Sequence, residues 1–244
     1  MKADARYIDR LKYKMSVAQK LALAKQSYTY YKLSSITGLP VTMLTRYVKG
    51  NVLPSLRRAR ELDEKLNKIM NLREEIRKRI KFDRDGYLDN TTLISNLTLL
   101  KLVAQYAVKR FLGKRVTKVL TAAVDGIPLA TMIASEINVD VLIAKRTKEV
   151  GVDEFLEETY IPSNSAIMMS LYLPKRLVSP GDDILIVDDV IRSGETQRAL
   201  INLVRRRRAY ITGIFTLIAI GNRWREKLEG LKDSPVVVLL QIPE

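Results

Sequence analysis

Two hydrophobic patterns divide this chain near residue 80. Over residues 15–80, apolar side chains recur every three or four positions with almost no strand signal, which predicts helices. Farther along, short unbroken apolar runs alternate with helical segments and predict the buried strands of a mostly parallel sheet; these runs are 116–124, 139–144, 184–187, 211–220 and 236–240. We therefore expect an all-helical domain over residues 1–80 and an α/β domain over residues 81–244.

Turn and capping residues predict where some elements begin and end. A helix over residues 60–80 should lead out of the first domain to a linker near residues 81–86. One of the residues Asp89, Asn90, Thr91 or Thr92 should then cap a helix that runs to about Phe111.

Residues 33–50 carry a more specific pattern, that of two short helices joined by a turn. Gly38 permits a sharp turn, and Pro40 suits the start of the second helix. The apolar side chains expected to face inward are Leu33, Ile36, Leu39, Leu44 and Val48. On the opposite face of the second helix, polar side chains at helical spacing form one stripe, which consists of Thr42, Thr45, Arg46 and Lys49.

This layout resembles the repressor-type helix-turn-helix, whose second helix lies in the major groove of DNA. By that resemblance, Arg46 would bind guanine through two hydrogen bonds, while Thr42 and Thr45 would touch base edges or methyl groups. The residues expected to contact double-stranded DNA, at bases or phosphates, are Lys32, Val41, Thr42, Thr45, Arg46, Lys49, Arg57 and Arg58. The alternative is an ordinary helical hairpin with a polar outer face.

The distribution of charge favours a polyanionic partner for the first domain. The net charge is +15, and residues 1–80 hold 19 Lys and Arg against 7 Asp and Glu, a balance of +12. The other residues have a balance of only +3. This asymmetry indicates nucleic acid, with an anionic membrane surface or a merely soluble basic surface as alternatives. In the second domain, the run Arg205 to Arg208 should form a solvated helix face, with an accessory DNA contact as the lesser alternative.

Composition excludes several classes of function. Cysteine and histidine are both absent, which excludes disulfides, zinc fingers, thiol nucleophiles and imidazole bases together. No apolar run approaches the roughly 18 residues of a membrane span, and the first residues lack the apolar stretch of a signal peptide. We expect a cytoplasmic protein without a membrane partner.

The segment from Ile184 to Thr196 carries the chemistry of the second domain. A short apolar strand ends in Asp188 and Asp189, and a turn with serine, glycine and threonine leads to a helix that begins near Gln197. Ligands of open α/β sheets bind outside the carboxyl ends of the strands, and a helix N-terminus directs N–H groups at an anion. Because two carboxylates can hold sugar hydroxyls or a metal, the site suits a sugar that carries a phosphate.

This segment resembles the 5-phosphoribosyl-1-pyrophosphate (PRPP) motif of type I phosphoribosyltransferases. The resemblance implies a mostly parallel, Rossmann-like sheet in which Asp188 and Asp189 bind the ribose hydroxyls of Mg²⁺-PRPP. It also implies that the loop 192–196 wraps the 5-phosphate with N–H groups and with the hydroxyls of its serine and threonine. One residue departs from the motif. Glu195 stands where the family usually has glycine, which places a like charge beside the phosphate unless the side chain points outward.

A second segment fits the same family. The strand over residues 116–124 is followed by Asp125, Gly126 and a proline-containing turn into a helix over 129–137, which resembles the pyrophosphate loop. After the strand over 139–144, the basic residues 145–148 would reach pyrophosphate or form a solvated charge run. The residues expected to bind PRPP are Asp125, Gly126, Lys145, Arg146, Asp188, Asp189, Val190, Ile191, Arg192, Ser193, Gly194, Glu195 and Thr196.

Two classes of function remain open. Residues 170–183 resemble the xanthine phosphoribosyltransferases and the purine repressors of Gram-positive bacteria, and the whole resemblance covers about residues 81–225. It implies a homodimeric transcription regulator that binds DNA and senses PRPP or a purine nucleotide. The alternative is an active phosphoribosyltransferase, in which Asp188 and Asp189 would support the charge that develops on the ribose as pyrophosphate leaves. An RNA-binding attenuation regulator on the same fold is the weakest alternative.

The helix-turn-helix pattern and the short segment after residue 220 favour the regulator. A phosphoribosyltransferase must also hold a nucleobase, and beyond the 211–220 strand the chain offers only residues 221–224, a helix and a final strand. Trp224 would be the residue to stack on a base, although a core aromatic is the expected role.

Overall fold

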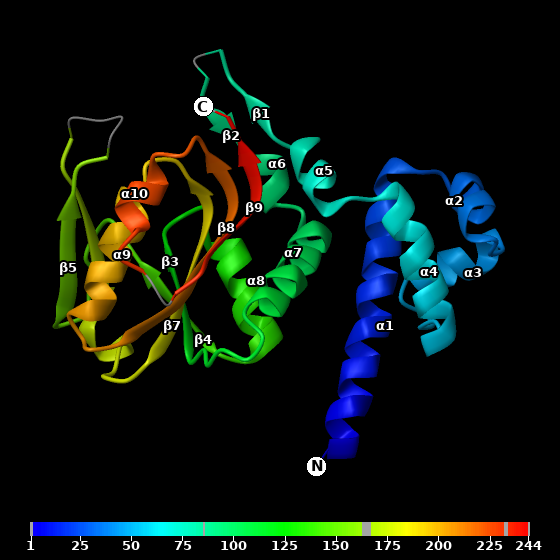
Figure 1. Ribbon diagram of the computed structural model, residues 1–244, viewed down its shortest axis with the longest axis horizontal. Helices are drawn as coiled ribbons and strands as arrows, with labels where there is room; N and C mark the ends of the chain where they lie inside the picture. Colours follow the sequence, from blue (N-terminus) through cyan, green and yellow to red (C-terminus); the bar gives the residue numbers. More distant parts are fainter. Residues whose placement is uncertain (1, 85, 163–166, 232–233, 244) are drawn as a thin grey trace. The chain divides into compact units, whose positions relative to one another are not determined.

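The computed structural model describes residues 2–84, 86–162, 167–231 and 234–243, and the chain divides into two compact units, residues 1–102 and 103–244 (Figure 1). The predicted boundary near residue 80 falls inside the first unit, and Asp85 of the predicted linker lies outside the described residues. Among the described residues, no helix has the length and hydropathy that crossing a bilayer requires.

The first unit consists mainly of helices around a small apolar core. The helices predicted for residues 15–80 are α1 (Lys2–Ser27), α2 (Tyr30–Thr37), α3 (Val41–Val48), α4 (Leu56–Ile69) and α5 (Leu72–Arg77). α1 packs against α3 and α4, and side chains spaced three or four positions apart are buried between them; these include Val17, Leu21, Leu44, Leu62 and Leu66. A salt bridge of 2.8 Å between Lys20 and Asp63 lies beside this core.

Two predicted helices are in fact interrupted, each at an asparagine. The helix predicted over residues 60–80 divides into α4 and α5, because the side chain of Asn71 accepts a hydrogen bond from the N–H of Arg73 at 2.9 Å. The helix predicted to run to Phe111 divides into α6 (Thr91–Ile94) and α7 (Leu97–Arg110), where Asn96 accepts from the N–H of Leu99 at 3.0 Å. Asparagine side chains compete with the backbone for these bonds and so favour caps over helix interiors.

The segment predicted as a linker contains a strand. β1 (Lys81–Phe82) pairs antiparallel with β2 (Leu88–Asp89), and Gly86 adopts a left-handed φ of 79° in the turn between them. The carboxylate of Asp83 accepts the N–H of Tyr87 at 2.8 Å and holds this turn. Asp89, one of the predicted capping residues, accepts the N–H of Thr91 at 3.0 Å and so stands at the start of α6.

The second unit is built on one parallel sheet, which confirms the predicted fold class. Its strand order is β4-β3-β7-β8-β9, and every neighbouring pair is parallel. The strands are β3 (Lys118–Ala122), β4 (Asp140–Ala144), β7 (Asp183–Ile191), β8 (Tyr210–Ile220) and β9 (Val236–Ile242). They read as continuous apolar runs because helices cover both faces: α8 (Ile127–Ile137) lies on one side and α9 (Glu195–Arg205) on the other (Figure 1).

A glycine on β8 allows α7 to lie close to the sheet. A Cβ atom at Gly213 would lie 2.4 Å from Cε1 of Phe111 and 2.8 Å from the carbonyl oxygen of Pro235, so no larger residue fits without a shift. Phe111 directly follows α7, and within that helix the ring of Tyr106 packs against Phe215 of β8, with centroids 6.4 Å apart.

An antiparallel hairpin beside the main sheet was not predicted from the sequence. It pairs β5 (Phe155–Tyr160) with β6 (Met169–Pro174), and the short 3₁₀ helix η1 (Lys175–Leu177) follows. β5 carries polar residues at three of its positions and therefore lacks the apolar run that identified the buried strands. Its order comes instead from pairing with β6 and from contacts with α9.

The prediction that Arg205 to Arg208 form a solvated helix face is confirmed only in its exposure: Arg205, Arg206 and Arg208 are exposed and Arg207 is half-buried, but only Arg205 belongs to α9. α9 ends at Arg205, and Arg208 adopts a left-handed φ of 55°. Arg206 forms a salt bridge with Glu158 of β5, and Nε of Arg207 donates to the carbonyl oxygen of Val178 at 2.9 Å. These contacts attach the turn formed by residues 206–208 to the β5–β6 hairpin and to the segment after η1.

Candidate functional site

Two neighbouring aspartates are buried near the carboxyl end of the central strand β7. The exposed fractions of Asp188 and Asp189 are only 7% and 8%. The apolar run had suggested that the strand ends just before the two acids. β7 instead continues to Ile191, so both acids lie within it. β7 pairs with β3 only as far as Ile186, so the two acids lie beyond that pairing.

The loop after β3 approaches this acid pair, as the two motifs predicted. A Cβ atom on Gly126 would lie 2.3 Å from Oγ1 of Thr121 and 3.0 Å from Oδ1 of Asp188, so only glycine fits. Gly126 is also the N-cap of α8, and the helix begins two residues earlier than predicted, with a proline in its first turn.

Hydrogen bonds fix the Asp188 carboxylate from two directions. Nε2 of Gln197, in the first turns of α9, donates to Oδ2 at 2.6 Å. The backbone N–H of Asp189 donates to Oδ1 at 3.1 Å. The acid therefore has a defined orientation before any ligand arrives.

Burial makes both aspartates weaker acids than usual. Loss of hydration raises the pKa of Asp188 well above its ordinary value, and the adjacent charge of Asp189 adds to the effect. Burial likewise raises the pKa of Asp189; its hydrogen bond with Asp188 lowers it, and the nearby charge of Asp125 raises it further. A cation or a set of hydroxyl donors would relieve this unfavourable pairing of like charges.

The raised pKa values predict that Asp188→Asn stabilises the ligand-free protein at neutral pH. A carboxyl whose folded-state pKa is raised contributes stability that is full below its unfolded-state pKa and lost as the pH rises through the folded-state pKa. The variant should therefore exceed the wild type in unfolding free energy at neutral pH. The difference should shrink as the pH falls toward about 4. Urea unfolding of both proteins across this range measures it, and a difference that grows on acidification would contradict the assignment.

The turn after β7 leads through a glycine directly into the N-terminus of α9. Gly194 adopts a left-handed φ of 87° and is the N-cap of α9, which begins at Glu195, two residues before the predicted start. A Cβ at Gly194 would lie 3.2 Å from Cβ of Lys227 and 3.3 Å from the backbone of Trp224. Glycine is therefore required here both for its conformation and for its contact with α10 (Trp224–Leu228).

Side chains from distant segments meet this turn. The hydroxyls of Tyr160, at the end of β5, and Thr196 lie 3.2 Å apart. Ser193 donates to the carboxylate of Glu195, and Nζ of Lys227 lies 3.3 Å from the same carboxylate. The Glu195 side chain is only 10% exposed, so it does not point outward.

The predicted basic residues lie at the far edge of the same end of the sheet. Lys145 and Arg146 follow β4, and β3 separates that strand from β7. Lys145 is half-buried and forms an ion pair with Glu149, while Arg146 is exposed.

Of the other residues predicted to bind PRPP, Ile191 is buried, and Val190 and Arg192 are half-buried.

Several residues that shape the site were not predicted from the sequence: Thr121, Tyr160, Gln197, Thr216 and Lys227. Thr216 of β8 stands opposite Asp188 in the strand register, and its buried hydroxyl has no hydrogen-bond partner among the described residues. Apart from Gln197, each of these residues approaches the acid pair or its loop from another segment of the chain, so no spacing within the motif identifies it.

The isolated hydroxyl of Thr216 predicts that Thr216→Val raises the stability of the ligand-free protein. Valine has nearly the same shape and removes a buried polar group that has lost its bond to water, for a gain of about 1 kcal/mol. Thermal and urea unfolding measure the change, and Thr212→Val is the control, because the Thr212 hydroxyl donates to the carbonyl oxygen of Arg115 at 2.8 Å. Destabilisation by Thr216→Val would contradict the assignment of a hydroxyl without a hydrogen-bond partner.

A cavity of about 610 Å³ lies at the carboxyl ends of β8 and β9. Its polar lining residues are Asn222, Arg223, Glu226 and Gln241. Trp224 does not line it: the indole is 4% exposed within the core, and its Nε1 donates to the carbonyl oxygen of Gly221 at 3.1 Å. Trp224 is thus a core residue, and it is not available to stack on a base.

In the first unit, α2 and α3 are joined by the predicted turn. Gly38 has a left-handed φ of 71°, its N–H donates to the carbonyl oxygen of Ser34 at 2.8 Å, and Nζ of Lys65 donates to that of Thr37 at 2.6 Å. Three of the predicted inward-facing side chains are buried: Leu33, Leu39 and Leu44.

Two other predicted core positions are only half-buried, and their neighbours replace them. Ile36 and Val48 are partly exposed, whereas Thr37 and Tyr47 are buried. The Thr37 hydroxyl donates to the carbonyl oxygen of Leu33 at 2.7 Å, so its burial leaves no polar group without a partner.

The residues predicted to contact DNA differ in exposure. Those that are exposed are Lys32, Thr42, Arg46, Lys49 and Arg57. Val41, Thr45 and Arg58 are half-buried, and the Thr45 hydroxyl donates to the carbonyl oxygen of Val41 at 2.8 Å. Arg57 and Arg58 each lie 3.7 Å from the carboxylate of Glu61, a distance at which exposed pairs contribute little.

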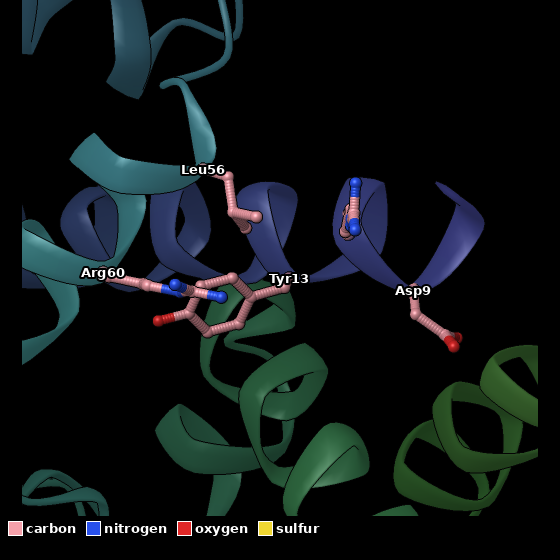
Figure 2. A pocket seen from close by; sticks show the side chains of 5 residues that line it. Asp9, Tyr13, Leu56 and Arg60 are labelled. Carbon is pink, nitrogen blue, oxygen red and sulfur yellow. The ribbon is translucent and has the colours of Figure 1, made fainter. Parts of the chain in front are cut away.

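A cavity of about 360 Å³ lies between α1 and the start of α4, and Figure 2 shows Leu56 and Arg60 of α4 extending toward Tyr13 of α1. Asp9 and Arg10 complete its lining. Burial, together with the charge of Asp63 and a hydrogen bond to it, raises the pKa of Tyr13. None of the residues predicted to contact DNA is among its lining residues.

The fold and the site together define a class: α/β proteins with a parallel sheet, in which loops that lead into helices gather at the carboxyl ends of the strands. The sequence model of one such family, the phosphoribosyl transferase domain, matches residues 90–240. The chain therefore belongs to the phosphoribosyltransferase family.

Relatives of this chain include both regulators and enzymes. The purine biosynthesis transcriptional repressor PurR of Bacillus subtilis is 26% identical over 207 residues, covering 84% of this chain and 69% of the repressor. The probable purine biosynthesis transcriptional regulator PurR of Streptococcus pneumoniae is 28% identical over 143 residues, covering 58% of this chain and 52% of the regulator. The xanthine phosphoribosyltransferase of Alkaliphilus metalliredigens is 29% identical over 154 residues, covering 62% of this chain and 76% of the enzyme. This chain thus matches about half the length of the streptococcal relative.

Solved structures agree on the fold. Adenine phosphoribosyltransferase from Rhodothermus marinus has a TM-score of 0.63 at 25% identity, covering 70% of this chain and 98% of that one. The enzyme from Trypanosoma brucei, solved with AMP, pyrophosphate and ribose-5-phosphate, has a TM-score of 0.63 at 18% identity, covering 70% of this chain and 79% of that one. Together with the purine regulators, they place this chain among proteins with a phosphoribosyltransferase fold and a likeness to transcription regulators.

Proposed function

We propose that this protein is a transcription regulator that binds double-stranded DNA through α2 and α3 and senses Mg²⁺-PRPP through its phosphoribosyltransferase domain. One observation carries the proposal: a buried pair of aspartates lies at the end of the sheet where Gly126 caps α8 and Gly194 caps α9. The first 80 residues of the same chain have a net charge of +12. The names of the PurR relatives support the same reading.

In this proposal, Asp188 and Asp189 accept hydrogen bonds from the ribose hydroxyls, and N–H groups of the loop 192–196 surround the 5-phosphate. Asp125 and Gly126 would stand beside the pyrophosphate, with Lys145 and Arg146 reaching it from β4. Carboxylate oxygens are suitable ligands for Mg²⁺, which would offset the charges of the diphosphate and the acids. Among the described residues, no cluster of three or more acidic side chains would hold the metal alone, so the ligand itself would supply the other oxygens.

The helical unit would supply the contact with DNA. α3 presents Thr42 and Arg46 to solvent, the exposed Lys49 follows it directly, and the Gly38 turn sets α3 against α2. A homodimer would place two such helices on two half-sites of one operator. Binding of phosphates by the surrounding lysines and arginines would release counterions, so affinity should fall steeply with salt concentration.

Regulation requires that PRPP bind the DNA-bound and the free protein with different affinities. The resemblance to the bacterial purine repressors predicts that PRPP releases DNA.

A fluorescence titration of the full chain tests the proposal. It uses duplex fragments from the protein's own promoter region, at one fixed salt concentration, with and without Mg²⁺-PRPP. Absence of any specific fragment, or indifference of the affinity to PRPP, would refute it.

An active phosphoribosyltransferase is the second candidate, and the similarity to a xanthine phosphoribosyltransferase favours it. The cavity beside Asn222 and Gln241 would then hold the base or the base portion of a nucleotide. Pyrophosphate release from PRPP, measured with each purine and pyrimidine base, separates the candidates. Robust turnover with one base would establish the enzyme.

A further inference from the structure

Glu195 occupies the phosphate loop in a way that bears on ligand binding. Its carboxylate accepts the hydroxyl hydrogen of Ser193, and it forms an ion pair with Lys227 of α10 at 3.3 Å. The carboxylate is thus a negative group at the N-terminus of α9, with a hydroxyl donor and a cation as its partners.

A ligand phosphate would seek two of the same partners, the N-terminus of α9 and the Ser193 hydroxyl. It is a dianion that prefers N–H groups at a helix N-terminus together with hydroxyl and ammonium donors. The Ser193 hydroxyl belongs to the loop that would bind the phosphate, but this hydroxyl already donates to the Glu195 carboxylate. With a side-chain exposure of only 10%, Glu195 lies inside the loop region, where water screens its charge poorly.

We infer that Glu195 is an internal competitor of the ligand phosphate and that Lys227 limits its effect by neutralising its charge. This inference rests on the proposed function and adds what sets the affinity at that site. Phosphate binding requires the Ser193–Glu195 hydrogen bond to break and the carboxylate to turn toward Lys227. The affinity for PRPP is therefore lower than the loop alone would provide, which places the response at high concentrations of the metabolite.

The test measures binding of three probes by calorimetry at fixed Mg²⁺ and salt concentrations: PRPP, ribose-5-phosphate and inorganic pyrophosphate. Glu195→Gln removes the charge and keeps the size, and should tighten PRPP and ribose-5-phosphate about tenfold, because both place a phosphate in this loop. Pyrophosphate, which would bind beside Gly126, should be unchanged. Glu229→Gln is the matched control, since this exposed residue ends α10 and carries the same charge change.

Lys227 provides the reciprocal test. Lys227→Met should weaken binding of PRPP and ribose-5-phosphate about tenfold in the wild-type background and have little effect in the Glu195→Gln background, because its role acts through Glu195. Thermal unfolding of each variant confirms that it is folded.

The outcomes separate this inference from the proposed function. Binding by the wild type with equal affinity in Glu195→Gln would overturn the inference and leave the proposed function intact. Equal tightening of all three probes would also overturn it, since that is a general effect of net charge. Tightening confined to the two probes with a 5-phosphate supports it. Absence of binding to every folded variant would overturn the proposed function as well.

Discussion

Replacing both Asp188 and Asp189 with asparagine should weaken Mg²⁺-PRPP binding by at least about 100-fold and leave the affinity for DNA unchanged. Each carboxylate would lose a charge-assisted hydrogen bond worth about 1.5–3 kcal/mol, and the pair would no longer attract Mg²⁺. The double variant should still fold, because the charges of the two buried acids repel each other in the ligand-free protein. Calorimetry with PRPP and a DNA titration with and without PRPP measure the two parts of the prediction.

The matched control is Asp140→Asn. Asp140 is an exposed acid at the opposite, amino end of β4, so its variant should retain both PRPP binding and the PRPP response. A double variant that keeps the wild-type affinity for PRPP would show that the metabolite binds elsewhere. A variant that loses DNA binding as well would show that the acids serve the fold.

Replacing Arg46 with alanine should produce the largest loss of specific DNA binding, about 1–3 kcal/mol or roughly 5- to 150-fold, with relaxed preference at one base pair. Arg46 is exposed on α3, so the loss would come from the contact and not from the core. Lys49→Ala should instead weaken binding to all sequences alike and reduce the salt dependence by about one unit of slope. Titrations at several salt concentrations with specific and scrambled duplexes measure both.

Lys68→Ala is the control for this pair of variants. Lys68 is exposed in the last turn of α4, away from α3 in the sequence, and its loss removes the same charge. It should change the affinity for DNA far less than Arg46→Ala. Equal losses for all three variants would mean that only total charge matters and that α3 is no recognition helix.

The fold of the second unit was predictable where burial produces a continuous apolar run. β3, β4, β7, β8 and β9 were all identified this way; β7 and β8 are buried along most of their length, and the edge strands β4 and β9 are apolar although only partly buried. β5 was missed because Glu157, Glu158 and Thr159 break the pattern, and its pairing with β6 is a tertiary property. The helix breaks at Asn71 and Asn96 were missed because each depends on a single side chain that bonds the backbone.

The candidate site was predictable where its residues are contiguous in sequence. Asp188, Asp189 and the following loop formed one recognisable segment, and Gly126 was found through a second. Gln197 could have been suspected from its place in the first turns of α9, where an amide can reach back to the strand. Lys227 and Tyr160 carry no such signal, because each approaches the loop from about thirty residues away.

The hairpin of β5 and β6 is attached to α9 at both ends of that helix. At the first turn, the hydroxyls of Tyr160 and Thr196 lie 3.2 Å apart. Near the last turn, Asn202 donates to Glu158 at 2.7 Å and Arg206 donates to the carbonyl oxygen of Glu157 at 2.5 Å. A molecule that took the Thr196 hydroxyl would free the forward attachment while the rear one stayed in place. The bonds of Asn202 and Arg206, the paired backbone hydrogen bonds between Lys145 and Tyr172, and the buried Leu171 and Leu173 would hold the hairpin in place, so the change would stay within the first turn of α9.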